Sequence, residues 1–420
     1  MTTRIKVVGV GGCGTNTVVS MIKMGLRGVE FYMVNTDKSH LDNAFNNVLT
    51  DDERSSLEGN LHTINIGEKA TKGQGAGADP AMGEQAAEES RKELTDMLAD
   101  TDLLFIVAGM GGGTGTGASP VIAKLAKEIN PDVLIISAVT KPLRIEFGKK
   151  MVIAEKGVEK LQKFVDSLII IPNQSMVEGD MSITLPCAYE KVNKIISNAV
   201  RSISDLINIP SQINVDFADI KKIMKGKGYS HIGLGMGEGP ATSDRMIKAV
   251  KAAASTDILN TNIAGATGLI ISIQSSKDIT YNELEEANIF IAELVAKDVE
   301  CIFGHHVDDK LEQQVIVTII AAGCKAENVP GARRGFAPQS QHQQQGIGMA
   351  QHSYPQARPV QQQQGPISQV VQQRPVQQPQ YQQPPVQQQP TRIDSTQGGG
   401  VNNETPSFMK RFLNRKRENR

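Results

Sequence analysis

The chain has 420 residues, long enough for two domains of ordinary size and a further segment. Its 44 lysine and arginine residues nearly balance 45 aspartate and glutamate residues, and the net charge of -1 gives no global preference for nucleic acid or an anionic membrane. The 4 cysteines lie far apart, without the paired spacings of a zinc site or the density of a disulfide scaffold, so we expect reduced thiols in a cytoplasmic protein.

Neither a secretory leader nor a membrane-spanning segment is expected. The N-terminus enters a strand-like run directly, without a charged leader, an apolar segment and a cleavage site. The longest apolar runs, such as residues 103–108, are much shorter than the roughly 20 residues that cross a bilayer. We therefore expect a chain that does not insert into a membrane by itself.

Short apolar runs alternate with helical patterns through the first part of the chain. Strands are expected at residues 5–10, 29–35, 102–109 and 133–140. Helices are expected at residues 14–25, 80–99 and 118–128. This alternation predicts right-handed crossovers and an α/β fold with a parallel sheet covered on both faces.

A long helix is expected next, at residues 185–208, where apolar side chains recur at helical spacing. Pro186 lies in its first turn and Pro210 lies just beyond its end. A second, smaller α/β unit is expected to follow. Its helices are predicted at residues 216–224, 244–254 and 281–297, and its strands at residues 268–274, 299–306 and 314–322.

The composition changes sharply near Pro330. From about residue 338 to 403 the chain is mostly Gln, Pro and Gly and cannot bury enough apolar surface to offset the entropy of ordering, so we expect a disordered linker. Residues 405–420 then regain apolar side chains among basic ones. From the physics alone, this last segment is either a docking peptide that folds on binding or a solvated charged terminus.

The first strand ends in a glycine-rich turn that leads into a helix. Glycines let the backbone approach a phosphate closely, and a helix N-terminus offers unpaired N–H groups. Gly9, Gly11 and Gly14 fit the dinucleotide pattern G-x-G-x-x-G, and Asp37 closes the second strand. Taken alone, this motif favours a NAD or FAD site, with a purely structural turn as the alternative.

A second glycine-rich loop, residues 109–117, follows another strand and precedes another helix. Six glycines and two threonines in nine residues form a run of backbone and hydroxyl donors that a purely structural turn would not need. Two such loops at the carboxyl ends of neighbouring strands suit a triphosphate held from two sides. The chain has no G-x-x-x-x-G-K-[ST] segment, so an ordinary P-loop NTPase is not expected.

The segment GMGGGTGTGASP closely resembles the signature loop of the tubulin and FtsZ superfamily, and the surrounding sequence resembles bacterial FtsZ in particular. Further matching segments, in the family order over residues 4–323, are VGVGGCGTN, VEFYMVNTD, IGEKATKGQGAGADP, VTKPLRIEFGKKM, IIIPN, SISDLI, INVDFADIKKIM and IFGHHVDD. The segment PSFMKRFLNRKR is similar to the family's C-terminal peptide, which favours docking. The resemblance implies a GTPase that polymerises head to tail into protofilaments of the bacterial division ring, in the cytoplasm beneath the membrane.

The resemblance also implies which residues hold GTP or GDP together with Mg²⁺, for which no metal-ligating side chain is assigned. The phosphate-binding set would be Gly11, Gly12, Cys13, Gly14, Thr15, Gly77, Ala78, Gly111, Gly112, Gly113, Thr114, Gly115, Thr116 and Gly117. The set at the sugar and guanine would be Asn16, Glu146, Lys150, Asn173, Tyr189 and Asn193. Because Tyr189 and Asn193 are four residues apart on the long helix, ring and amide project from the same face, as stacking on and reading a base require.

The catalytic candidates Asp216 and Asp219, with Asn214 assisting, follow the long helix. Taken alone, Asp216 is a good N-cap and Asp219 is a favourable first-turn acid. The resemblance instead places this segment against the nucleotide of the neighbouring subunit, where two carboxylates and an amide orient the attacking water. Hydrolysis is then expected to rise with assembly.

Three features depart from the family pattern. Cys13 stands where the family usually has glycine, and we hypothesise a reactive thiol of low pKa at the helix N-terminus. Lys150 replaces the usual arginine, which keeps the charge but loses the planar fork. The chain between Asp37 and Ile64 is longer than the family norm and is expected to form an exposed loop beside the nucleotide.

The expected organisation is a GTP-binding domain (1–185), a central helix with its following loop (186–214), a second, GTPase-activating domain (215–325), a linker (326–404) and a docking peptide (405–420). The peptide is expected to bind membrane-tethering division proteins through Phe408, Arg411, Phe412, Leu413 and Arg415. Two alternatives remain open at this point. One is a NAD-type oxidoreductase, which leaves the second glycine loop unexplained, and the other is a non-hydrolysing relative that acts as a structural or regulatory filament protein.

Overall fold

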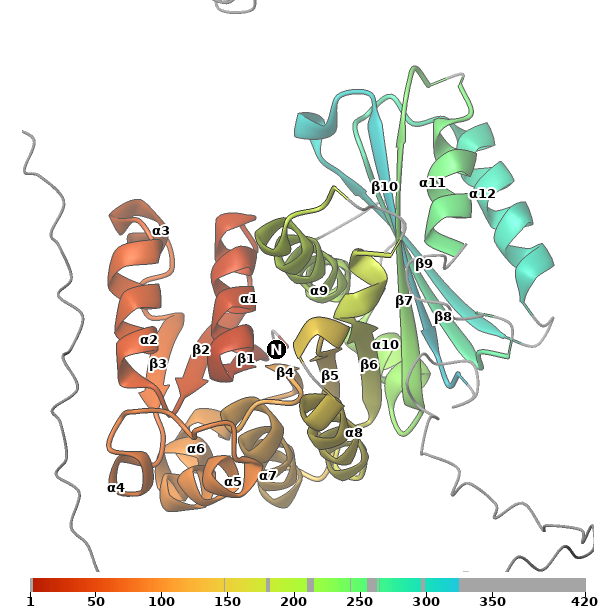
Figure 1. Cartoon of the computed structure of the whole chain (residues 1–420). Coiled ribbons are helices and arrows are strands. Elements are labelled where there is room, and N and C mark those ends of the chain that lie inside the picture. Colours follow the sequence, from red (N-terminus) through yellow and green to blue (C-terminus); the bar gives the residue numbers. More distant parts are fainter. Residues whose placement is uncertain are drawn as a thin grey trace, which may run out of the picture. The chain divides into compact units, whose positions relative to one another are not determined.

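The structure, a computed structural model, describes residues 3–146, 148–178, 182–209, 215–241, 243–254, 263, 265–295 and 299–324 (Figure 1). Its strands are β1 (Ile5–Val10), β2 (Glu30–Asn35), β3 (Leu61–Asn65), β4 (Leu103–Gly109), β5 (Leu134–Lys141), β6 (Ser167–Pro172), β7 (Gly228–Glu238), β8 (Gly268–Ser275), β9 (Glu300–Val307) and β10 (Gln314–Ala322). They form one sheet in the order β3-β2-β1-β4-β5-β6-β7-β10-β8-β9. The expected linker and docking peptide lie outside the described residues.

The helices cover both faces of this sheet. They are α1 (Gly11–Lys23), α2 (Lys38–Asn43), α3 (Asp51–Ser55), α4 (Glu68–Thr71), α5 (Pro80–Glu89), α6 (Arg91–Leu98), α7 (Thr114–Ile129), α8 (Gly148–Gln162), α9 (Leu185–Asn208), α10 (Phe217–Met224), α11 (Arg245–Ala254) and α12 (Tyr281–Leu294). One hydrophobic core joins α1, α9 and α10 to one face, and the other joins α5 to α8, α11 and α12 to the opposite face. The predicted α/β class is confirmed.

The first half of the sheet, from β3 to β6, is parallel throughout. β1, β4 and β5 are apolar and buried along nearly their whole length, as strands covered on both faces must be. Their carboxyl ends therefore meet at one edge of the sheet, where both glycine-rich loops emerge. This arrangement sets the position of the site described below.

The long helix α9 runs from the carboxyl ends of the strands to their amino ends. Thr184 caps its start by accepting a hydrogen bond from the Cys187 backbone N–H, and Pro186 occupies the first turn, where no N–H partner is needed. The helix has the predicted bounds. At its far end, the Asn208 side chain donates a hydrogen bond of 2.9 Å to the carbonyl of Gly28, which lies just before β2.

The second half of the sheet continues the first rather than forming a separate sheet. β7 pairs with β6 over three residues in parallel, β10 pairs antiparallel with β7 and β8, and β9 pairs with β8 in parallel. β7 was not predicted from the sequence, because glycines alternate along it and glycine disfavours strands. Those glycines let α11 approach closely, since a Cβ on Gly235 would lie 1.8 Å from the Ala249 carbonyl oxygen.

Two further expectations are corrected by the structure. The single helix expected at residues 80–99 is divided at Ser90 into α5 and α6, and the Ser90 hydroxyl accepts a hydrogen bond from the Gly67 backbone N–H. The segment after Asp37 is not simply an exposed loop. It contains α2, a π-helical turn (Ala44–Val48) and α3, with Leu41, Leu49 and Leu57 buried against the sheet.

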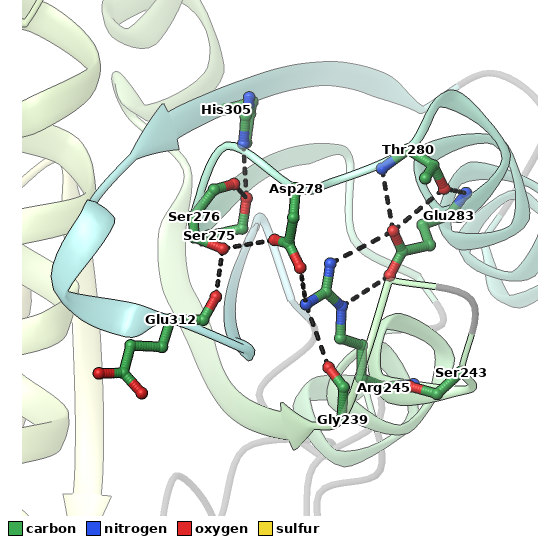
Figure 2. Close-up of polar contacts among 10 residues, drawn as sticks. All are labelled: Gly239, Ser243, Arg245, Ser275, Ser276, Asp278, Thr280, Glu283, His305 and Glu312. Carbon is green, nitrogen blue, oxygen red and sulfur yellow. Dashed lines mark hydrogen bonds and ion pairs between the residues drawn. The ribbon is translucent and has the colours of Figure 1, made fainter.

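A buried ion-pair cluster ties together the loops at one end of the second half (Figure 2). Arg245 is 0% exposed and forms ion pairs of 2.8 Å with both Glu283 and Asp278. It also donates to the Gly239 carbonyl, while Glu283 completes a capping box with Thr280 at the start of α12. The cluster thereby joins α11, α12 and the ends of β7 and β8, and each charged group in it has a partner.

Candidate functional site

The two glycine-rich loops lie against each other at the carboxyl ends of β1 and β4. α1 begins at Gly11, directly after β1, and no side chain caps its first turn, so its N–H groups remain for a ligand. Gly11 has a φ of 72°, and a Cβ on it would lie 2.9 Å from the Gly115 backbone nitrogen. Glycine adopts this conformation without strain, and its lack of a Cβ permits the close contact between the loops.

Most glycines of the two loops are required by packing, which is a different reason from the one given by the sequence analysis. A Cβ on Gly14 would lie 2.4 Å from the Val107 carbonyl oxygen, and a Cβ on Gly117 would lie 2.1 Å from the Pro80 carbonyl oxygen. Gly112 differs, because a Cβ there would meet no atom within 4 Å. Gly112 therefore borders open space from which a ligand can approach the backbone.

Loop hydroxyls maintain the shape of the second loop. The Thr116 hydroxyl accepts a hydrogen bond of 2.9 Å from the Gly111 backbone N–H, and the hydroxyls of Thr114 and Thr36 lie 2.6 Å apart. Thr15, in the first loop, is fully buried and its hydroxyl has no partner among the described residues. Gly113 also packs tightly, since a Cβ on it would lie 2.7 Å from the Ala76 Cβ.

A third loop, residues 72–79, closes over the same edge. Gly77 and Ala78 both have positive φ angles, of 58° and 60°, and both are exposed. The left-handed conformation is uncommon for alanine and concentrates at functional segments. The loop is held by a hydrogen bond of 3.2 Å from the Gly75 N–H to the Thr36 carbonyl oxygen.

A cavity of about 300 Å³ opens beside these loops. It is lined by Cys13, Asn16, Met110, Gly111, Gly112, Thr140, Pro142, Glu146, Lys150, Asn173, Tyr189, Val192 and Asn193. All six side chains expected at the sugar and guanine are in this set, although they come from four segments that are far apart in the chain. The lining also includes four residues that were not predicted: Met110, Thr140, Pro142 and Val192. Two of them could have been found from the sequence, since Thr140 ends the predicted strand at this edge and Val192 lies beside Asn193 on α9.

A second cavity, of about 810 Å³, is larger but lies at the amino ends of β1, β2 and β4, away from both glycine loops. Its lining includes Arg4, Asp100 and Asp102, and the first two form an exposed ion pair of 2.8 Å. Size alone would select this cavity. The smaller one contains the glycine loops and the convergent polar groups, so we take it as the candidate site.

Glu146 anchors one wall of the candidate site as an anion. Its carboxylate accepts hydrogen bonds from Lys150 at 2.9 Å and from the Tyr189 hydroxyl at 3.3 Å. Burial would raise the pKa of Glu146, but the hydrogen bonds from Lys150, Leu143 N–H and Tyr189 and the Lys150 charge outweigh burial and lower that pKa below its ordinary value. A charged carboxylate is a strong acceptor for ligand hydroxyl groups.

Two amide side chains, those of Asn173 and Asn193, line the other walls of the cavity. Asn173 is buried, and its Oδ1 atom has no hydrogen-bond partner among the described residues. Asn193 Oδ1 lies 2.9 Å from the Thr17 hydroxyl, which fixes its orientation. A buried acceptor without a partner is costly in an empty site, and a ligand N–H group would satisfy it. The residues therefore fit a ligand that combines a base, a hydroxylated sugar and phosphates.

Two expectations about charged or reactive groups change. Burial raises the pKa of the Cys13 thiol, despite hydrogen bonds to Thr140 and Thr17 that lower it, so the hypothesis of a low pKa is wrong. Asp37 caps α2 by accepting from the His40 N–H at 3.0 Å, which gives it a structural role that the dinucleotide pattern did not predict.

The catalytic candidates lie far from the chain's own cavity. Asp216 caps α10 by accepting a hydrogen bond of 2.9 Å from the Asp219 N–H, and both side chains are exposed. α10 lies at the amino ends of the strands, because Lys225 after its last turn pairs at 2.7 Å with Asp132, just before β5. Along α9, the rise from Tyr189 to the far end is about 28 Å. Asn214 lies outside the described residues.

Among the described residues, no helix has the length and apolarity to span a membrane. Within the same part of the chain, no three His, Cys, Asp or Glu side chains gather as a metal-binding group. A magnesium ion bound with a nucleotide takes most of its ligands from phosphates and water, so the loops fit such an ion without a protein cage.

Comparison with known proteins agrees with this geometry. The GTPase domain of the Tubulin/FtsZ family matches residues 4–179, and the C-terminal domain of the FtsZ family matches residues 228–325. Mitochondrial division protein fszB of Dictyostelium discoideum is 40% identical over 319 residues, which cover 76% of this chain and 82% of that protein.

Solved structures show the same relationship. An empty FtsZ dimer from M. jannaschii has a TM-score of 0.69 at 34% identity and covers 77% of this chain and 89% of that chain. CetZ1 from Haloferax volcanii, a GDP-bound monomer, shares the fold with a TM-score of 0.65 at 23% identity, covering 79% and 96% of the two chains. The chain therefore belongs to the tubulin/FtsZ family of GTP-binding cytoskeletal proteins and carries both domains of its FtsZ branch.

Proposed function

We propose that this chain hydrolyses GTP at the junction between two subunits of a head-to-tail protofilament. The observation that carries the proposal is the separation of the candidate cavity from the acidic turn, which lie near opposite ends of α9. One subunit cannot bring its own Asp216 to its own cavity without unfolding. A second copy stacked along the same direction would bring its acidic turn to the first cavity.

The nucleotide would be bound by groups that already converge on the site. The N–H groups at the starts of α1 and α7 would hold the phosphates, with Gly77 and Ala78 at the terminal phosphate. Glu146 would accept from ribose hydroxyls, Tyr189 would stack on guanine, and Asn173 would receive one of its N–H groups. Magnesium bound with the phosphates would neutralise charge that develops there.

The acidic turn would act on the attacking water. Asp216 is held in place by the hydrogen bond to the Asp219 N–H, and Asp219 lies three residues later on the first turn of α10. Both carboxylates are exposed and therefore accessible to a neighbouring subunit. Together with Asn214, they would accept hydrogen bonds from the water and orient it toward the terminal phosphate.

The filament's biological role would be division. A relative with 40% identity is a mitochondrial division protein, and the chain's own C-terminal segment has the apolar and basic pattern of a docking peptide. We assign it to a bacterial division ring in the cytoplasm beneath the membrane, attached by tethering proteins that bind Phe408, Arg411, Phe412, Leu413 and Arg415. A fluorescent fusion that stays diffuse during division would contradict this role.

A complementation assay tests catalysis between subunits. Asp216→Ala should bind GTP but lower turnover by about 100-fold, because it removes the group that positions the water. Gly112→Val should retain the acidic turn but fill the space over the second loop, so it should not bind nucleotide. Each variant alone should be nearly inactive, and a mixture should recover activity, because one supplies the cavity and the other the turn.

Light scattering provides the control for this assay. The proposal is contradicted if both variants enter common filaments and the mixture remains as inactive as its components. Wild-type turnover per subunit should also rise steeply across the concentration at which scattering begins. Turnover that is constant across that concentration would show that each subunit hydrolyses GTP alone.

A further inference from the structure

His40 lies at the edge of the proposed phosphate site, although no motif singled it out. The residue is on α2, in the segment between Asp37 and Ile64. A Cβ built on Gly12 would lie 3.8 Å from His40 Nε2 and 3.9 Å from its Cε1, and within 4 Å it would meet no other group from outside the helix among the described residues. The imidazole edge thus borders the open space above Gly12, in the first turn of α1.

Backbone hydrogen bonds hold α2, the helix that carries His40, in place. The His40 N–H donates to Asp37 Oδ1 at 3.0 Å, which anchors α2 at its first turn. The Lys38 N–H donates to the Gly73 carbonyl at 3.1 Å, and Leu41 is buried in the core beneath. α2 is therefore held between the sheet and the loop of residues 72–79, and the His40 side chain is half-buried rather than free in solvent.

A hydrogen-bond relay determines which ring nitrogen can donate. Asn35 is buried, and its Oδ1 accepts from the Asp37 N–H at 3.3 Å, which leaves its amide Nδ2 to face the histidine. Asn35 Nδ2 lies 3.5 Å from His40 Nδ1. Since an amide nitrogen only donates, Nδ1 is the acceptor and the neutral ring carries its proton on Nε2. This Nε2–H group is the one beside the space above Gly12.

We propose that His40 is a phosphate-binding residue, which donates a hydrogen bond through Nε2 to the phosphate chain of the nucleotide above Gly12. This inference rests on the proposed nucleotide site. The α1 N-terminus supplies backbone donors from below, and His40 supplies a side-chain donor from the facing wall. α2 thereby contributes a side chain to the recognition of GTP and GDP over uncharged guanosine.

The test compares ligands that differ only in phosphate. Affinities for GTP, GDP and guanosine are measured with wild-type and variant full-length chain below the assembly concentration. His40→Ala should weaken GTP and GDP binding by about tenfold, as expected for one lost hydrogen bond to a charged group, and should leave guanosine binding unchanged. His40→Gln, which retains a side-chain N–H donor, should lose less than His40→Ala.

His62→Gln is the matched control. His62 is a second histidine of the same region, on β3, and it stacks on Tyr32 with ring centroids 4.7 Å apart, away from the loops. This variant should bind all three ligands as wild type does. Thermal unfolding of each nucleotide-free variant checks the fold, and His40→Gln remains informative if His40→Ala does not fold.

The outcomes separate this inference from the function on which it rests. If wild type does not prefer GTP to guanosine, the proposed function itself is wrong. If wild type does prefer GTP, and His40→Ala either binds all ligands normally or loses affinity equally for all three, only the role of His40 is wrong. A loss restricted to GTP and GDP, with partial rescue in His40→Gln, supports a direct phosphate contact.

Discussion

The Arg245 cluster and the cavity beside the glycine loops are two polar regions that differ in how their buried polar groups are hydrogen-bonded. In the cluster around Arg245, each charged group is paired within the chain (Figure 2). Arg245 itself has no exposed surface. In the cavity beside the glycine loops, Glu146 and Lys150 are paired, but Asn173 Oδ1 is buried without a partner among the described residues. In the Arg245 cluster the charged groups have partners within the chain, whereas the cavity contains an acceptor without one.

This difference distinguishes polar groups that stabilise the fold from polar groups that bind a ligand. A buried ion pair that is complete within the chain fixes the relative positions of the elements that carry it. A buried acceptor without a partner costs free energy until a ligand satisfies it, so its presence indicates a binding role. Changes in the first region should therefore affect unfolding, and changes in the second should affect nucleotide affinity.

The largest expected effect is on the Arg245 cluster. Arg245→Ala leaves Glu283 buried without its partner, so it should lower the free energy of unfolding by about 3–5 kcal/mol. Urea unfolding of the GDP-bound chain, below the assembly concentration, measures this change. Lys248→Ala, which removes an exposed pair between α11 and Asp244 just before it, should remain close to wild type. An equal loss in both variants would contradict the structural role.

The same cluster should also contribute acid sensitivity. The hydrogen bond from Arg245 lowers the pKa of Asp278 below its ordinary value. A carboxyl whose pKa is lower in the folded state stabilises the fold fully above about pH 4, and that contribution is lost as the pH falls through the folded pKa. Asp278→Asn should therefore flatten the acid limb of the stability profile.

Two glycines of one loop give the next contrast. Gly117→Ala should destabilise the chain by about 1–3 kcal/mol, because the added Cβ would lie 2.1 Å from the Pro80 carbonyl oxygen. Gly112→Ala meets no atom within 4 Å, so the fold should be unaffected while GTP affinity falls. Thermal unfolding measures the stability of both variants, and GTP titration measures their affinity for the nucleotide. Similar behaviour of the two would mean that the loop is purely structural.

The alternation of apolar runs and helical patterns predicted four strands of the parallel half, β1, β2, β4 and β5, and the bounds of α9, whereas β3, β6 and the helix α8 were not predicted. β7 was missed because strand propensity does not anticipate a helix packed on a row of glycines such as Gly233, Gly235 and Gly237. The division at Ser90 was missed because the residues on both sides favour helix, and only the contact with Gly67 shows the break.

The site was predictable where a motif covered it. The six side chains expected at the sugar and base do line one cavity, but that expectation came from resemblance, since they are distant in sequence. His40 belongs to no motif, and Thr140 lies in a matching segment in which it was assigned no role, so the folded chain was needed to place them beside the loops. The pKa of Cys13 was predicted in the wrong direction because burial cannot be read from a position at a helix start.

A smaller effect is expected from Asn173→Ala. The change removes an acceptor that has no partner in the nucleotide-free chain, so the free energy of unfolding without nucleotide should not fall and should rise by at most about 1 kcal/mol. GTP affinity should fall by about tenfold, because the hydrogen bond that the ligand makes is lost. Unfolding in the absence of nucleotide and GTP titration separate these effects. A clear loss of stability without nucleotide would show that Asn173 is structural.

The smallest effect concerns the reactivity of Cys13. Since burial raises its pKa, the thiol should be protonated at pH 7, and alkylation should be slow and should increase with pH. Exposed Cys187 is the internal reference, and peptide mapping follows both residues in one sample. Because Cys13 lines the same cavity as Asn173, added GDP should slow its alkylation and leave that of Cys187 unchanged. Rapid alkylation of Cys13 at pH 7 would show that the positive end of α1 outweighs burial, and no protection by GDP would place the nucleotide outside this cavity.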